Sequence, residues 1–209
     1  MNTEPPRPDW LDGRRALVVG LGKASDAVAD TLNRKGAVVI RSDPGFIDAP
    51  EIAQAFERAE LESGGQIDIL VHAGTAITDA APETIRLEAW RATQSADIDG
   101  RFLHAAEFVR RRLAAEAQGA ILFLMPSAHM GPGRAAAATA HGALDNLVKS
   151  LAVEWARDGV RTNAIASRVT EKFDAATGDE QTSLGNLAAY LVSDYAAYVT
   201  GCVMGVEEG

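Results

Sequence analysis

Short β-branched runs alternate with longer amphipathic runs along the whole chain, and this alternation is the strongest constraint on its fold. Strand character is found at residues 16–19, 37–41, 67–71, 120–125, 161–165 and 202–206. Helix character is found at residues 24–35, 51–62, 90–116, 135–157 and 184–193. A strand, a helix and a second strand in this order form a βαβ unit, whose two strands are parallel. The sequence therefore predicts an α/β fold built around a parallel sheet.

The pattern continues without an internal repeat or a linker, so a single domain over residues 1–209 is expected. With 209 residues, of which 47% are apolar, the chain can bury one sizeable core. Prolines in the opening MNTEPPRPDW predict a disordered lead-in at residues 1–10, which lacks the apolar stretch of a signal peptide.

Composition argues against several classes of partner and ligand. The net charge of −9 disfavours nucleic acid and anionic membranes, because both attract cationic surfaces. The longest apolar runs, such as residues 120–125, are too short to cross a bilayer. Cys202 is the only cysteine, so no internal disulfide can form and a cytoplasmic location is expected. The four histidines are scattered without metal-ligand spacing, so we expect no metal site.

Five segments of the chain carry a resemblance to a known family. They are LDGRRALVVG at residues 11–20, IDILVHAG at 67–74, LEAWRATQSADIDGRFL at 87–103, ALDNLVKSLAVEWARDGVRTNAIA at 143–166 and LAAYLVSDYAAYVTGCVMGVEEG at 187–209. In this order they resemble the short-chain dehydrogenase/reductase (SDR) family. The resemblance implies a Rossmann-like doubly wound parallel sheet. It also implies two deletions, one of the family's third strand with its helix and one of most of its substrate lobe.

The resemblance places the catalytic tetrad at positions where this chain has other residues. In active members a Tyr and a Lys stand one helical turn apart, and the Lys cation lowers the Tyr pKa from about 10 toward neutrality. The matching positions here are Ala137 and His141. The family's Ser falls at Pro126, with Ser127 one place later, and its helix Asn falls at Asp97. Because alanine has no proton to donate or accept, we expect no catalysis by the isolated chain.

Three of these residues have alternative interpretations. His141 is either a substitute general acid/base, since imidazole titrates near neutral pH, or a polar histidine near the start of a helix. Ser127 either contacts a substrate carbonyl or supplies a turn hydroxyl before Gly-Pro-Gly at residues 131–133. Asp97 is either a base or a polar helix residue. In each case the structural interpretation is favoured.

The family's cofactor turn is altered at the positions that contact phosphate. In the family's register its three glycines fall at Gly20, Ala24 and Asp26. Read as the general G-x-G-x-x-G/A pattern, they fall at Gly20, Gly22 and Ser25. Asp26 would lie in the first helical turn, where the helix dipole attracts an anion and a carboxylate competes with a pyrophosphate.

Other residues around this turn have mixed implications. Lys23 could offset Asp26 by contacting a phosphate. Asp43, after the second predicted strand, is either a ribose-binding acid or a turn residue in Ser-Asp-Pro-Gly. Gly74 ends the segment that resembles the family's Asn-Asn-Ala-Gly turn. We expect no cofactor in this chain, and interpret Gly20, Gly22, Asp26, Asp43 and Gly74 as vestiges of a cofactor site.

Three functions follow from these expectations. The first is a non-catalytic subunit that assembles with an active SDR homologue, with two copies of each chain and NAD(P) in the active partner. The second is an NAD(P)-dependent oxidoreductase with an unusual site at Ser127 and His141. The third is a nucleotide-sensing regulatory domain without turnover.

The first function is favoured because the catalytic positions are altered while the helices that the family uses for assembly are kept. The helix predicted at residues 135–157 carries more apolar residues than covering its own sheet requires. They are Leu147, Val148, Leu151 and Trp155. We expect them to contribute to an interface between subunits.

Overall fold

A computed structural model describes residues 9–43, 45, 48–74, 80–126, 135–167 and 178–206. The strands are β1 (Arg15–Val19), β2 (Val38–Ser42), β3 (Ile69–His72), β4 (Gly119–Pro126), β5 (Val160–Ser167) and β6 (Val203–Val206). The α-helices are α1 (Lys23–Arg34), α2 (Ala49–Ser63), α3 (Leu87–Gln94), α4 (Gly100–Ala114), α5 (Ala135–Trp155) and α6 (Gly178–Val192). Short segments are the π-turn η1 (Ser95–Asp99) and the 3-10 turns η2 (Ala156–Asp158) and η4 (Asp194–Ala196).

All six strands pair in parallel, in the order β2-β1-β3-β4-β5-β6. The strand order reverses at β1, so the sheet is doubly wound and Rossmann-like, as predicted. Only α2 separates β2 from β3, and β3 pairs directly with β1. Within the described residues β2 is therefore an edge strand, and the shortened sheet predicted from the sequence is confirmed.

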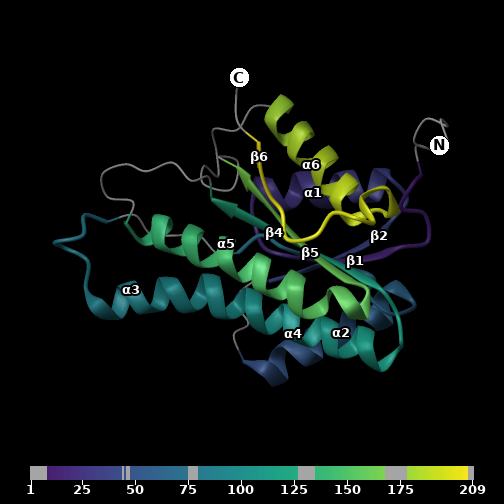
Figure 1. The fold of residues 1–209 in the computed structure, drawn as a ribbon, viewed down its shortest axis with the longest axis horizontal. Helices are drawn as coiled ribbons and strands as arrows, with labels where there is room; N and C mark the ends of the chain where they lie inside the picture. Colours follow the sequence, from purple (N-terminus) through teal and green to yellow (C-terminus); the bar gives the residue numbers. More distant parts are fainter. Residues whose placement is uncertain are drawn as a thin grey trace.

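Helices cover both faces of the sheet (Figure 1). Helices α1 and α6 pack on one face, where Val28 and Leu32 meet Leu184 and Ala188 in a continuous core. Helices α2, α4 and α5 pack on the other face around Phe56, Phe108, Leu144 and other buried apolar residues. Side chains of β1 point alternately into the two cores and are fully buried from Ala16 to Val19. This explains why β1 reads as an uninterrupted apolar run.

Two element boundaries differ from the sequence expectation. The helix expected at residues 90–116 is one long rod in Figure 1, but η1 interrupts its α-helical hydrogen bonding between α3 and α4. A π-turn adds one residue to a helical turn, which amphipathic spacing alone does not reveal. Helix α6 begins at Gly178 rather than at residue 184. Its first turn carries polar residues, so the apolar periodicity missed it.

The apolar residues of α5 that we expected at an interface pack against the core of the chain, and their contribution to an interface stays a prediction. Val148 and Leu151 are buried, and the half-buried Leu147 and Trp155 pack against the same core. These residues cover the sheet, while Val153, Thr139 and several small or polar residues are exposed on α5. Among the described residues, no helix is both long enough and apolar enough to cross a membrane.

Candidate functional site

The turns that follow β1 and β3 lie against each other at the carboxyl edge of the sheet. Gly20, directly after β1, has φ of 143°, and a Cβ placed on it would lie 2.6 Å from the Cβ of Ala73. Ala73 follows β3 and donates its N–H to the carbonyl of Val19 at 2.7 Å. Ligands of doubly wound sheets bind at this edge, where the strand order reverses. Gly20 is therefore a glycine because the next turn leaves no room for a side chain.

The amino end of α1 is a glycine-capped turn beside this edge. Gly22 is the N-cap with φ of 95°, and its carbonyl accepts the Ser25 hydroxyl at 2.8 Å. Asp26 lies in the first turn of α1, where the sequence placed it. Its carboxylate forms an ion pair with Arg41 from β2, which is partly exposed. The pair spans the two elements that would border a nucleotide, and it balances the charge of Asp26.

Asp43 follows β2 and turns the chain. Its Oδ1 accepts the N–H of Gly45 at 2.8 Å, which is the hydrogen bond of an Asx turn. This contact supports the turn interpretation over the ribose-binding one. Pro44, which lies between these two residues, is outside the described part of the chain.

A buried ion pair occupies the position of the family's helix Asn. Asp97 lies in η1, and both its side chain and that of Arg101 are 1% exposed. Oδ1 of Asp97 accepts hydrogen bonds from Nε and Nη2 of Arg101, at 3.2 and 3.0 Å. Nη1 of Arg101 donates to the carbonyl of His72 at 2.8 Å. Asp97 is thus neither a free base nor a solvated helix residue, and it anchors the turn after β3.

Gly74 sits directly over this ion pair. Its φ is 74°, and a Cβ there would collide with Nη2 of Arg101 and Oδ1 of Asp97. Its N–H donates to Nδ1 of His72 at 2.9 Å. The glycine that ends the Asn-Asn-Ala-Gly-like turn is therefore required by the packing of Asp97 and Arg101 beneath it.

Two buried histidines complete this cluster, which consists of His72, Asp97, Arg101 and His104. The imidazole rings of His72 and His104 meet edge to face, with centroids 4.8 Å apart. Burial, together with the neighbouring Arg101 and His104, holds the pKa of His72 well below its usual value of 6.5. Burial also lowers the pKa of His104, against a smaller raising effect from the Gly100 carbonyl. Both rings are therefore neutral at neutral pH.

The tetrad positions on α5 carry no proton-transfer pair. Ala137 is 4% exposed, so its methyl group is packed within the fold. His141 lies one turn later on α5 and is half-buried. Ser127 lies outside the described residues, so the structure does not place it relative to His141. Within the described chain, no group of His, Cys, Asp and Glu side chains is arranged to hold a metal ion.

Sequence reasoning missed His72, Arg101 and His104. Asp97 and Arg101 are four residues apart, a spacing that usually indicates an exposed ion pair on a helix. His72 ends an otherwise apolar strand, and a polar residue at the carboxyl end of a buried strand was the available signal. Nothing in the sequence pattern indicated the π-turn that places Asp97 against Arg101 in the interior.

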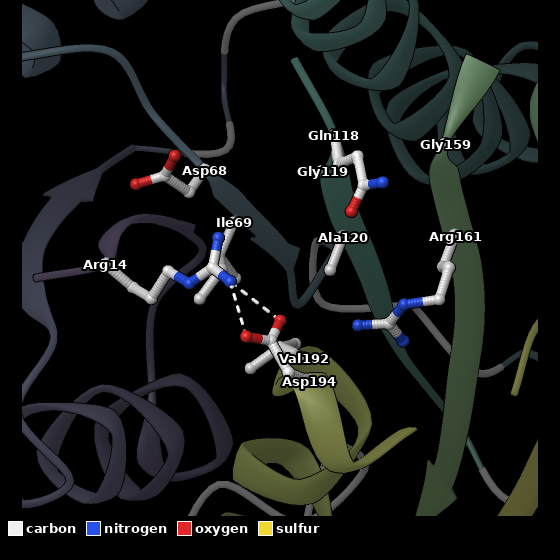
Figure 2. A pocket seen from close by; sticks show the side chains of 10 residues that line it. All are labelled: Arg14, Asp68, Ile69, Gln118, Gly119, Ala120, Gly159, Arg161, Val192 and Asp194. Atoms are coloured by element: carbon white, nitrogen blue, oxygen red, sulfur yellow. Dashed lines mark hydrogen bonds and ion pairs between the residues drawn. The ribbon is translucent and has the colours of Figure 1, made fainter. Parts of the chain in front are cut away.

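A cavity with a volume of about 40 Å³ lies at the opposite edge of the sheet (Figure 2). Arg14, which precedes β1, points toward Asp194 and forms an ion pair with it at 2.7 Å. Arg161 donates to the carbonyls of Leu191 and Ser193, at 2.6 and 3.0 Å. These bonds fasten the chain after α6 to the amino ends of the strands. The cavity is structural, because ligands bind at the carboxyl ends.

Comparison with known proteins matches the chain to a family model described as enoyl-(acyl carrier protein) reductase, over residues 13–183. The chain is 30% identical to cis-4-hydroxycyclohexanecarboxylate dehydrogenase of Sinomonas cyclohexanicum over 93% of this chain and 86% of that protein. It is 26% identical to glucose 1-dehydrogenase 2 of Bacillus subtilis over 95% of each chain.

Solved structures share the same fold. A gluconate 5-dehydrogenase from Burkholderia cenocepacia, in complex with NADP and tartrate, matches with a TM-score of 0.82 and 22% identity over 96% of each chain. A short chain dehydrogenase from Mycobacterium smegmatis matches with a TM-score of 0.84 and 20% identity over 98% of each chain.

Proposed function

Since this chain belongs to the short-chain dehydrogenase/reductase family, we propose that it is a non-catalytic member that assembles with an active homologue and supports it. The observation that carries the proposal is Ala137. Its position should hold the proton-transferring Tyr, yet the side chain is a methyl group packed in the fold. Loss of general acid/base assistance alone is typically worth about 10²–10⁴-fold in rate.

The residues of the cofactor edge do not fit a bound dinucleotide well. Within the described chain β2 is the sheet edge, so the strand that would wall an adenine pocket is lacking. The Asp26–Arg41 ion pair stands between the first turn of α1 and β2. We therefore propose that this chain carries no NAD(P) and that the active partner does.

The Asp26–Arg41 ion pair also favours a second candidate, a nucleotide-sensing domain without turnover. Arg41 balances the carboxylate that would otherwise repel a phosphate, and a phosphate could exchange with that carboxylate on the guanidinium. An oxidoreductase that uses Ser127 and His141 is the third candidate, and the names of the relatives as dehydrogenases favour it.

Removing the charge of Asp26 should tighten NAD(P)H binding. In Asp26→Asn the carboxylate leaves the first turn of α1 and Arg41 becomes available, so affinity should rise by up to about fivefold, since a helix N-terminus favours an anion by up to about 1 kcal/mol. Asp30→Asn, an exposed position one turn later on α1, is the matched control. Calorimetric titration measures the NAD(P)H affinity of both variants. An equal change in affinity would show that the carboxylate of Asp26 does not specifically oppose binding.

The proposed interface lies on the layer formed by α4 and α5. Phe102 and Leu113 of α4 are 44% and 46% exposed, and Val153 of α5 is 81% exposed. Large apolar side chains of this kind are candidates for burial against another subunit. An active homologue explains both this surface and the altered tetrad, whereas self-association explains only the surface. We propose a hetero-oligomer with two copies of each chain.

Co-expression with a homologue that retains Tyr-x-x-x-Lys tests the proposal. Alone, this chain should reduce no ketone or acyl thioester with NAD(P)H, even after Ala137→Tyr and His141→Lys, because the cofactor turn and the substrate lobe are also altered. Light scattering should then detect a complex with the homologue.

Val153→Lys should weaken the affinity of that complex about tenfold or more, because the substitution places a charge in an apolar contact. Leu61→Lys on α2 is the matched control, since Leu61 is 85% exposed on another helix and should leave the complex unchanged. Three results would contradict the proposal: turnover by the unmodified chain, a chain that stays monomeric, or a homo-oligomer that does not bind the homologue.

A further inference from the structure

His72 holds the turn after β3 at two points. Its Nδ1 accepts the N–H of Gly74 at 2.9 Å, so the side chain closes the turn that it begins. Its carbonyl accepts Nη1 of Arg101 at 2.8 Å, which ties the same turn to α4. The imidazole ring is fully buried. The geometry of the turn therefore depends on the hydrogen-bonding state of one ring nitrogen.

The hydrogen bonds define the tautomers of both histidines. Because Nδ1 of His72 accepts, its proton is on Nε2, and that buried N–H has no hydrogen-bond partner among the residues that the structure describes. In His104, Nδ1 donates to the Gly100 carbonyl, 2.7 Å away, and the buried Nε2 has no hydrogen-bond partner within the described part of the chain. The hydrogen bond that Nδ1 of His72 accepts therefore requires the neutral form of His72.

The turn that His72 closes supports the turn after β1. Ala73 fills the space beside Gly20 and donates its N–H to the Val19 carbonyl. Ala73 therefore connects the Gly74 turn with Gly20. The two turns form one unit at the carboxyl edge of the sheet.

We propose that His72 is a proton-operated latch: the neutral imidazole holds the Gly74 turn against Gly20, and the protonated imidazole releases it. Protonation adds a hydrogen to Nδ1, which then faces the N–H of Gly74 instead of accepting it. The proton comes from solvent when the turn opens, and no other bond is broken. This latch concerns the chain's own turns, so it goes beyond the proposed function and stands whether or not the chain has a catalytic partner.

The charged groups around His72 set the direction of the effect. Arg101 and His104 face it from α4, and Asp97 from η1 pairs with Arg101. Phe56 of α2 packs on His104, and Phe123 of β4 lies under Arg101, so these two neighbours of the cluster are uncharged. A protonated His72 would thus be a second cation beside Arg101, and Asp97 would be the one carboxylate available to both.

The sign of the pH dependence follows from the lowered pKa of His72. As the pH falls, His72 in the unfolded chain, with a pKa of 6.5, is protonated at a higher pH than His72 in the folded chain. The latch therefore stabilises the fold fully above pH 6.5, and this stabilisation falls with pH until the folded pKa is passed. The turn is expected to open on the acidic side of the ordinary histidine range.

Hydrogen exchange of the Gly74 and Gly20 amides in the full chain tests the latch. Between about pH 7.5 and about pH 4.5 the wild-type Gly74 amide should lose about tenfold or more of its protection, beyond the change in intrinsic exchange rate, because a buried hydrogen bond is lost. His72→Asn keeps an acceptor for Gly74 but does not titrate, so its protection should stay constant. His141→Asn, a half-buried histidine on α5, is the matched control and should behave as wild type.

Two outcomes would overturn the latch: flat protection in the wild type, or an unchanged pH dependence in His72→Asn. If that variant does not fold, an NMR titration of the wild-type chain tests the latch instead. The His72 ring and the Gly74 amide must then titrate with one midpoint, and separate midpoints would refute the proposal.

Discussion

Replacing Asp97 by alanine should lower the free energy of unfolding by about 3–5 kcal/mol, because the buried guanidinium of Arg101 would lose its counter-ion. Arg101 is 1% exposed and cannot reach water without displacing the turn after β3. The hydrogen bond to the His72 carbonyl would remain, but a carbonyl does not neutralise the charge. Guanidinium chloride unfolding, with a check that the m-value is unchanged, measures the loss.

An exposed ion pair of the same spacing provides the control. Asp145 and Lys149 on α5 are also four residues apart, with side chains 31% and 56% exposed. Asp145→Ala should cost about 0.5 kcal/mol or less, since exposed helix pairs contribute little. The double variant Asp97→Leu with Arg101→Met should recover most of the stability, because replacing both charges by apolar groups removes the unpaired ion. Similar losses at Asp97 and Asp145 would contradict the buried pairing.

Gly74→Ala should cost about 2–5 kcal/mol of unfolding free energy. A left-handed backbone conformation alone costs a non-glycine residue about 1–2 kcal/mol, and Gly74 has φ of 74°. Crowding adds about 1–3 kcal/mol, because the new methyl group meets Arg101 and Asp97. Thermal and denaturant unfolding of the variant give the total.

Gly64→Ala separates the two contributions. Gly64 ends α2 with φ of 72°, and a Cβ there would have no atom within 4 Å. Its φ is close to that of Gly74, so only the backbone strain should appear in this variant. The difference between the two alanine variants therefore measures the crowding by the ion pair. A difference near zero would mean that Arg101 can move aside at little cost.

Much of the fold could be predicted because the periodicity of apolar residues and the order of the strands and helices indicate which side chains are buried. The strand at residues 16–19 is fully buried between two helical layers, and its apolar run shows this directly. The short connection from β2 to α2 indicated the shortened sheet. Hydrophobic spacing was less informative for α5, since Leu147 and Trp155 could equally cover the sheet or face a partner. Only the packed structure shows that they join the core.

The buried cluster could not be predicted, for a physical reason. Its members come from β3, η1 and α4, and each residue has an ordinary surface interpretation in isolation. Asp97 becomes interior only because η1 rotates the helix, and Arg101 fits only because Gly74 has no side chain. Such mutual dependence between distant positions is invisible to spacing rules. The glycines after β1 and β3 had a clearer signal, because a glycine after a buried strand often marks close backbone approach.

The edge position of β2 has a consequence for how molecules of this chain meet one another. The strand reads Val-Val-Ile-Arg-Ser, and three consecutive β-branched residues on an open edge would invite strands from other molecules to add to the sheet. A charged side chain in such a strand opposes this, because a neighbouring strand would have to bury it. Arg41 is that residue, and its ion pair with Asp26 fixes the guanidinium beside the edge. The ion pair between α1 and β2 thus also opposes edge-to-edge aggregation.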